Sequence, residues 1–212
     1  MSQILKRLKR DGRISLRSQV VVALRDAILS GNLKPDSTLN EKDLAKQFKV
    51  SKTPVREALT LLDHEGLIKT LPRKGYYLTP ITVNYVHEFF DLRIILESAA
   101  AEMAASKITD EQVNQLSALV PDANPDADIA ERLDRNVEFH YAIAQISGNG
   151  RLATLIKGLL REMQRVIAAG YVLGQHEKVL AALREGDGRR AAEAMRHHIE
   201  EVRRKALRVV GA

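Results

Sequence analysis

Apolar side chains recur at helical spacing along most of the chain. In the first third they lie every four positions from Leu16 to Ile28, and they recur at helical spacing again from Val55 to Leu62. Positions three and four apart lie on one face of an α-helix, so each run predicts an amphipathic helix that buries this face. A shorter helix is expected between them, over residues 41–48.

Two short runs rich in apolar residues follow the third of these helices. Residues 67–71 and 76–79 are predicted strands, and the turn-forming residues 72–75 (Pro-Arg-Lys-Gly) join them. The third helix has a good N-cap candidate in Ser51 and ends near Gly66. Three helices followed by a hairpin predict a winged helix-turn-helix.

Beyond Pro80 the apolar spacing stays helical, and we expect no strand there. Short breaks rich in Gly, Pro and Asn separate the helical stretches. The chain is therefore expected to be mainly α, with a winged helix-turn-helix over residues 1–80 and an antiparallel all-α bundle over residues 81–212. The helices of the bundle are expected at residues 82–106, 109–119, 127–147, 150–169, 172–185 and 188–209.

Composition narrows the chemistry of this 212-residue chain. It has no cysteine, which excludes a disulfide framework, a cysteine zinc site and a thiol nucleophile. It has no apolar run near the roughly 18–20 residues of a membrane span, and its first residues lack the pattern of a secretory signal. We therefore expect a cytoplasmic protein with no membrane partner.

The charge of the chain is unevenly distributed. Residues 1–80 carry 16 Lys and Arg against 8 Asp and Glu, whereas residues 81–212 carry 17 against 19. A basic region joined to a nearly neutral one indicates an anionic partner, such as nucleic acid or a membrane surface, for the first region alone. The alternative is that the basic residues only keep this region soluble and bind no anionic partner.

Polar side chains gather where the third predicted helix begins. A recognition helix must place hydrogen-bond donors at its N-terminal end, where they reach base edges in the major groove. Lys52 and Arg56 are four residues apart and share one face of this helix, while its apolar residues face inward. Lys42 and Lys46 on the preceding helix are placed to approach phosphates. Any one lysine taken alone is best explained as a solvated charge, but the whole set predicts DNA binding.

The N-terminal region resembles the DNA-binding domain of GntR-type bacterial transcription regulators. The resemblance rests on the motif Val-Ser-Lys-Thr-Pro-Val-Arg-Glu-Ala-Leu at residues 50–59 and on flanking matches at residues 24–45 and 65–68. Lys52 departs from the arginine usual in the family, which replaces a bidentate donor by a point charge. The resemblance implies DNA contacts by Lys42, Ser51, Lys52, Thr53, Arg56, Lys74 and Gly75.

Three histidines of the second region lie on otherwise apolar helix faces. His176 stands 11 residues before Asp187, the centre of a predicted turn, and His198 stands 11 residues after it. In an antiparallel helix pair these two side chains should stand at the same level and face each other. With His140 from another helix, three imidazoles can converge, which suits zinc, nickel or another borderline metal. The alternative for each histidine is a core residue with an ordinary hydrogen-bond partner.

The second region resembles the helical effector domain of the FadR-like branch of the same family. The motifs that carry the resemblance are Asp-Leu-Arg-Ile-Ile-Leu-Glu at residues 91–97, Asn-Val-Glu-Phe-His at 136–140 and Ser-Gly-Asn at 147–149, with further matches at 176–183 and 194–199. Many members of this branch hold a divalent metal with one Asp and three His, and the metal helps bind a small carboxylate effector.

The resemblance implies a set of metal ligands, and two further residues of this region are candidate effector contacts. Asn136 stands where aspartate is expected, so a neutral amide replaces an anionic ligand. Arg93 lies on an apolar stripe, where a buried guanidinium needs an anionic partner, either a carboxylate effector or an internal acid such as Glu97. By position, the ligands for zinc or a nickel-like ion are Asn136, His140, His176 and His198. The candidate effector contacts are Arg93 and Asn149.

The sequence therefore predicts a ligand-responsive DNA-binding transcription regulator, most simply a repressor, that binds a two-fold symmetric operator as a homodimer. A small carboxylate effector in the helical region, together with a divalent metal, would control it. One alternative is a metal-dependent enzyme that uses the histidines, although the chain shows no separate general base and no His-Glu-x-x-His motif. Another is an architectural protein that binds DNA without sequence preference through its basic region.

Overall fold

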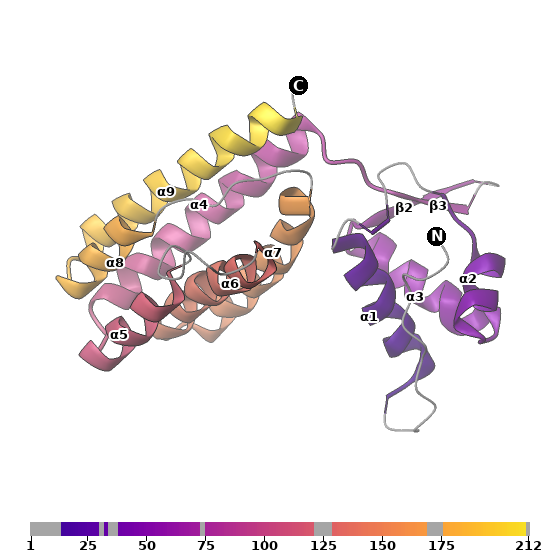
Figure 1. The fold of residues 1–212 in the computed structure, drawn as a ribbon, viewed down its shortest axis with the longest axis horizontal. Helices are drawn as coiled ribbons and strands as arrows, with labels where there is room; N and C mark the ends of the chain where they lie inside the picture. Colours follow the sequence, from indigo (N-terminus) through magenta and orange to yellow (C-terminus); the bar gives the residue numbers. More distant parts are fainter. Residues whose placement is uncertain are drawn as a thin grey trace. The chain divides into compact units, whose positions relative to one another are not determined.

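The computed structural model describes residues 14–29, 32–33, 38–72, 75–120, 129–168 and 176–210. The chain forms two compact units that divide between Ile81 and Thr82, next to the expected boundary at residue 80. In the described part of the chain, the first unit consists of the helices α1 to α3 and a small sheet, and the second unit consists of helices alone (Figure 1).

The first unit is built on three helices at the expected places. They are α1 (Leu16–Leu29), α2 (Glu41–Phe48) and α3 (Lys52–His64). Their apolar faces meet in one core, in which Leu24, Val55 and Leu59 are fully buried. The Asn40 side chain caps α2 by accepting a hydrogen bond from the backbone N–H of Lys42 at 2.8 Å. Ser51 is the N-cap of α3, as expected, but its side chain makes no capping hydrogen bond.

The sheet of this unit has one strand more than the predicted hairpin. The strands β1 (Thr38–Leu39), β2 (Ile68–Leu71) and β3 (Gly75–Leu78) are antiparallel in the order β1-β3-β2. Gly75 has a φ of +95°, and a Cβ at this position would lie only 2.7 Å from the carbonyl oxygen of Leu39. The glycine is therefore required for β1 and β3 to approach, a structural reason that the sequence did not reveal.

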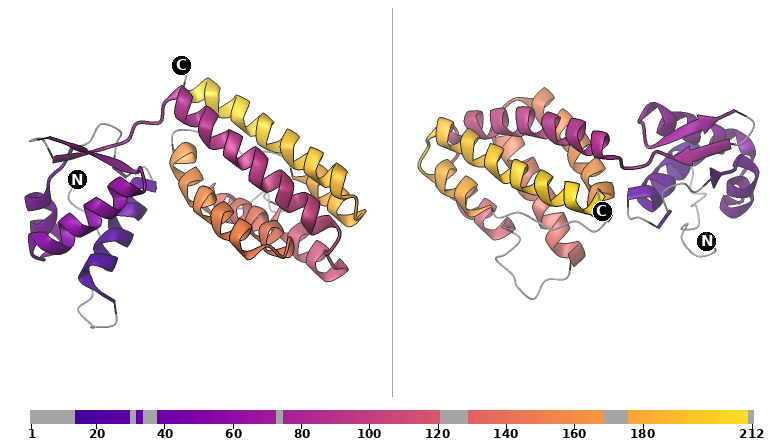
Figure 2. Two further views of the ribbon diagram at one scale, coloured as in Figure 1. Left: turned by 180° about the vertical axis from the view of Figure 1, so that it is seen from behind. Right: turned by 90° about the horizontal axis from the view of Figure 1, so that it is seen from above.

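The second unit is an all-helical bundle in its described part. Two long helices, α4 (Val83–Ala105) and α9 (Gly188–Val210), run side by side in opposite directions, and α6 (Ile129–Ile146) and α7 (Gly150–Ala168) form a second pair (Figure 2). The shorter helices are α5 (Asp110–Leu119) and α8 (Glu177–Arg184).

Most helix boundaries of the second unit lie within two residues of the prediction, and α8 is the exception. It begins at Glu177 rather than at residue 172, and residues 171–175 lie outside the described part of the chain. Large side chains fill the bundle, among them the fully buried Phe90, Phe139 and Ile156. Within the described residues, no helix is both long enough and apolar enough to cross a membrane.

Candidate metal centre and nucleic-acid interface

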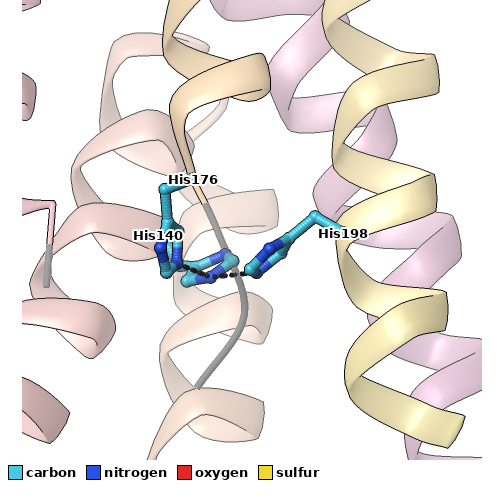
Figure 3. Close-up of side chains that lie close together, drawn as sticks. All are labelled: His140, His176 and His198. Carbon is cyan, nitrogen blue, oxygen red and sulfur yellow. Dashed lines mark hydrogen bonds between the residues drawn. The ribbon is translucent and has the colours of Figure 1, made fainter. Parts of the chain in front are cut away.

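Three imidazole rings converge in the core of the helical unit. His140 comes from the middle of α6, His176 directly precedes α8, and His198 comes from α9 (Figure 3). Nε2 of His140 lies 3.3 Å from Nε2 of His176 and 3.2 Å from Nε2 of His198. One ring nitrogen from each histidine lies within 4.8 Å of the others, and all three residues are buried. A single ion among these nitrogens would be reached by all three side chains.

The hairpin of α8 and α9 brings two of these histidines together. The rings of His176 and His198 have centroids 4.4 Å apart, which is the juxtaposition that their equal separation from Asp187 predicts. His176 differs from expectation in one respect, because it is the N-cap of α8 rather than a residue within the helix. The neighbouring His197 is exposed and lies near Glu200, with 3.8 Å between its Nδ1 and the carboxylate.

A buried acid fixes the orientation of His140. One carboxylate oxygen of Glu97 lies 2.5 Å from Nδ1 of His140, and the other accepts a hydrogen bond of 2.6 Å from Nε of Arg93. Nδ1 of His140 thus faces this carboxylate, and its Nε2 faces the other two histidines. The sequence indicated Glu97 only as a partner for Arg93, and its contact with His140 was missed.

Burial and neighbouring charges set the protonation of this cluster. Burial alone would raise the pKa of Glu97, but Arg93 and His140 beside it outweigh that effect and hold its pKa well below the usual range. Burial, followed by the charges of the other two histidines and of Arg93, lowers the pKa of His176 well below its ordinary value. Glu97 is therefore ionised and His176 is neutral. A histidine must be neutral at the ligating nitrogen to bind a metal, so His176 is in the required state.

The donor set fits a borderline divalent metal. Buried imidazoles whose Nε2 atoms converge are ligands that zinc, nickel and copper accept. Asn136 is buried one helical turn before His140, so its amide can lie on the same face of α6. The Glu97 carboxylate behind His140 provides the kind of support that ligating histidines usually have.

The two predicted effector contacts are placed differently from the histidines. Arg93 is buried, with its guanidinium hydrogen-bonded to Glu97 and to the sulfur of Met163. It therefore makes the internal ion pair that was the alternative to an effector contact. Asn149 is exposed and caps α7, since its side-chain oxygen accepts from the backbone N–H of Leu152. The structure does not bring Asn149 to the histidines, and an effector role for either residue stays a prediction.

The predicted DNA contacts form an exposed group at the start of two helices of the first unit. Lys42 lies in the first turn of α2, and Ser51, Lys52 and Thr53 lie where α3 begins. All four are exposed, as is Arg56 one turn further along α3. Lys74 lies outside the described residues, and Gly75 opens β3.

Two family models together match most of the chain. Residues 16–78 match the model described as bacterial regulatory proteins of the gntR family. Residues 88–201 match the FCD domain. The first match covers the unit with the exposed basic helix ends, and the second covers the bundle with the three histidines.

Individual relatives show the same two-part similarity. An HTH-type transcriptional regulator in an unstable DNA locus of Streptomyces ambofaciens is 30% identical over 195 residues, which cover 88% of this chain and 83% of that protein. The HTH-type transcriptional repressor RspR of Escherichia coli is 30% identical, over 88% of this chain and 87% of its own. The solved structure of E. coli McbR/YncC superposes with a TM-score of 0.69 at 26% identity, covering 93% of this chain and 98% of that one.

Proposed function

The chain belongs to the GntR family of bacterial regulators and is a DNA-binding transcription regulator with an FCD domain; from this premise we propose that it is a repressor that binds a two-fold symmetric operator as a homodimer. The enzyme alternative is wrong, because the family and the relatives are transcription regulators. Repression is supported by the likeness to a protein named as a repressor.

The exposed N-terminal end of α3 supports sequence-specific DNA binding. Lys52, Thr53 and Arg56 lie on the solvent side of this helix, while Val55 and Leu59 anchor its other side in the core. A helix held in this way can enter the major groove and present its donors to base edges. One such helix reads only a few base pairs, so two copies on inverted half-sites are needed for a specific operator.

The three converging imidazoles carry the proposal for the regulatory site. A divalent metal held by His140, His176 and His198, with Asn136 completing the protein ligands, would supply positive charge and an open position for a carboxylate effector. Because Asn136 is neutral, the protein ligands of such an ion would carry no negative charge. An anionic effector would therefore balance the positive charge of the metal ion, which these neutral ligands do not compensate.

The proposed metal would tie together three segments of the bundle. Its ligands come from α6, from the residue before α8 and from α9, while Glu97 connects the same site to α4. A ligand that binds one arrangement of these helices better than another shifts the population toward that arrangement. Since α4 begins two residues after the winged unit ends, a shift of α4 would be passed to the DNA-binding unit.

The DNA-binding part of the proposal is tested by selecting duplexes from a random pool with the purified full chain. We expect enrichment of a motif with two inverted half-sites. Arg56→Ala should then weaken binding of the selected duplex by at least about 30-fold, because a base contact worth ~1–3 kcal/mol is lost in each half-site. Arg196→Ala, which removes the same charge from an exposed position of α9, is the control and should bind like the wild type. No enriched motif, or full affinity of Arg56→Ala, would contradict the proposal.

A further inference from the structure

The guanidinium of Arg56 is held by an acid from the preceding helix. Nε of Arg56 lies 3.1 Å from both carboxylate oxygens of Glu41, and Nη2 donates to one of them at 2.9 Å. The hydroxyl of Tyr76 donates to the same carboxylate at 3.2 Å. Glu41 therefore links the proposed recognition helix α3 to strand β3 of the wing.

Secondary structure fixes each member of this group. Glu41 is the first residue of α2, directly after the N-cap Asn40. Tyr76 lies on β3, where it pairs with Leu39 on β1, two residues before Glu41. The side chain of Glu41 is 22% exposed and that of Arg56 is 63% exposed. The carboxylate is thus the half-buried anchor, and the guanidinium extends from it toward solvent.

The hydrogen bonds to Glu41 use a defined edge of the guanidinium. They occupy Nε and one N–H of Nη2, so both N–H groups of Nη1 and the second N–H of Nη2 point away from Glu41. The outer N–H groups of Nη1 and Nη2 are parallel and form the fork that matches O6 and N7 of guanine.

We propose that Glu41 is a positioning residue that aims the outer fork of Arg56 at a guanine in the major groove, and that Tyr76 holds Glu41 in place from the wing. This inference rests on the proposed role of Arg56 as a base-reading residue. The hydrogen bond from Arg56 also lowers the pKa of Glu41, so the carboxylate keeps the negative charge that a strong pairing needs. An oriented arginine loses less side-chain freedom when it binds DNA than an unrestrained one.

A carboxylate on a DNA-facing surface also acts on DNA through its charge, and this effect can be told apart from the positioning of Arg56. Its negative charge repels phosphates, so its removal should strengthen binding to every duplex alike. Loss of a positioning residue should instead weaken the preference for guanine at one position of each half-site. The pattern across base-pair variants therefore distinguishes the two roles.

The experiment measures binding of the full chain to the selected duplex and to each of its single base-pair variants, at fixed salt. Glu41→Gln keeps the shape of the side chain and removes its charge. We expect it to lower discrimination by about tenfold at one G·C pair of each half-site, and to bind unrelated duplexes as tightly as the wild type or more tightly. Tyr76→Phe should reduce discrimination at the same base pair by a smaller factor.

Asp43→Asn is the matched control, because Asp43 is an exposed acid in the same first turn of α2. It should leave discrimination unchanged at every position. On an Arg56→Ala background, Glu41→Gln should cause no further loss of discrimination, since its effect acts through Arg56. Wild-type discrimination in Glu41→Gln, or an equal loss in Asp43→Asn, would overturn the inference while leaving the role of Arg56 intact. Unchanged discrimination in Arg56→Ala would overturn the role of Arg56 and the inference with it.

Discussion

Replacing Glu97 with alanine is expected to destabilise the helical unit by about 3–5 kcal/mol. Glu97 is 2% exposed and its partner Arg93 is 1% exposed, so removing the carboxylate takes away the anionic partner of a buried guanidinium. Nδ1 of His140 loses its partner in the same step. Hydrogen exchange of peptides from α4 and α6, measured with metal chelated, reports on this unit separately from the winged one. A decrease of about 3 kcal/mol in the free energy of unfolding corresponds to roughly 150-fold faster exchange of the most protected amides.

The control for this variant is an ion pair at the surface of the same helix. Asp91 on α4 accepts from Arg203 at 2.8 Å, but it is 62% exposed, so Asp91→Ala should cost less than about 1 kcal/mol. The double variant Arg93→Met with Glu97→Leu should be more stable than Glu97→Ala, because it leaves no unpaired buried charge. A Glu97→Ala protein as stable as Asp91→Ala would show that the buried pair does not support the bundle.

The second large effect is expected on metal binding. His176→Ala combined with His198→Ala should weaken zinc binding by at least about 1,000-fold. This estimate divides a binding free energy of roughly 10 kcal/mol among four ligands and removes two of them. Competition with a chromophoric chelator measures the affinity of the purified full chain. The variant leaves His140 and its contact with Glu97 in place, so the remaining site is one imidazole and one amide.

His197→Ala is the matched control for the histidine variant. His197 is next to His198 in sequence, but its side chain is 78% exposed and lies near Glu200. Its removal should leave the zinc affinity unchanged. Equal zinc affinity in the wild type and in the His176→Ala, His198→Ala protein would exclude the buried cluster as the site.

Much of the fold could be predicted from apolar periodicity and from helix-breaking residues. The expected helix over residues 41–48 is observed as Glu41–Phe48, and the last helix of the bundle begins at the expected Gly188. Strand β1 was missed because it has only two residues, which is too short for an alternating pattern. The start of α8 was placed too early because apolar residues continue the helical spacing on the N-terminal side of His176.

The part of the candidate site that depends on the spacing of residues around a helix–turn–helix connection could be predicted from the sequence. The equal separation of His176 and His198 from a turn is a property of the sequence, and their rings lie together in the structure. The contacts of Glu97 with His140 and of Glu41 with Arg56 are 43 and 15 residues apart in sequence. Each depends on how two helices pack, and a single sequence carries no signal for such packing.

The affinity of the full chain for its selected operator, measured over a range of free zinc concentrations, tests regulation through the three histidines most directly. We expect the operator affinity to change at least about fivefold between metal-free and saturated protein, since coupling between sites is typically worth ~1–3 kcal/mol. The free zinc concentration at the midpoint of this change should equal the zinc dissociation constant from chelator competition. The operator affinity of the His176→Ala, His198→Ala protein should stay constant over this range. A wild-type operator affinity that stays constant while zinc occupies the site would contradict control of DNA binding by this cluster.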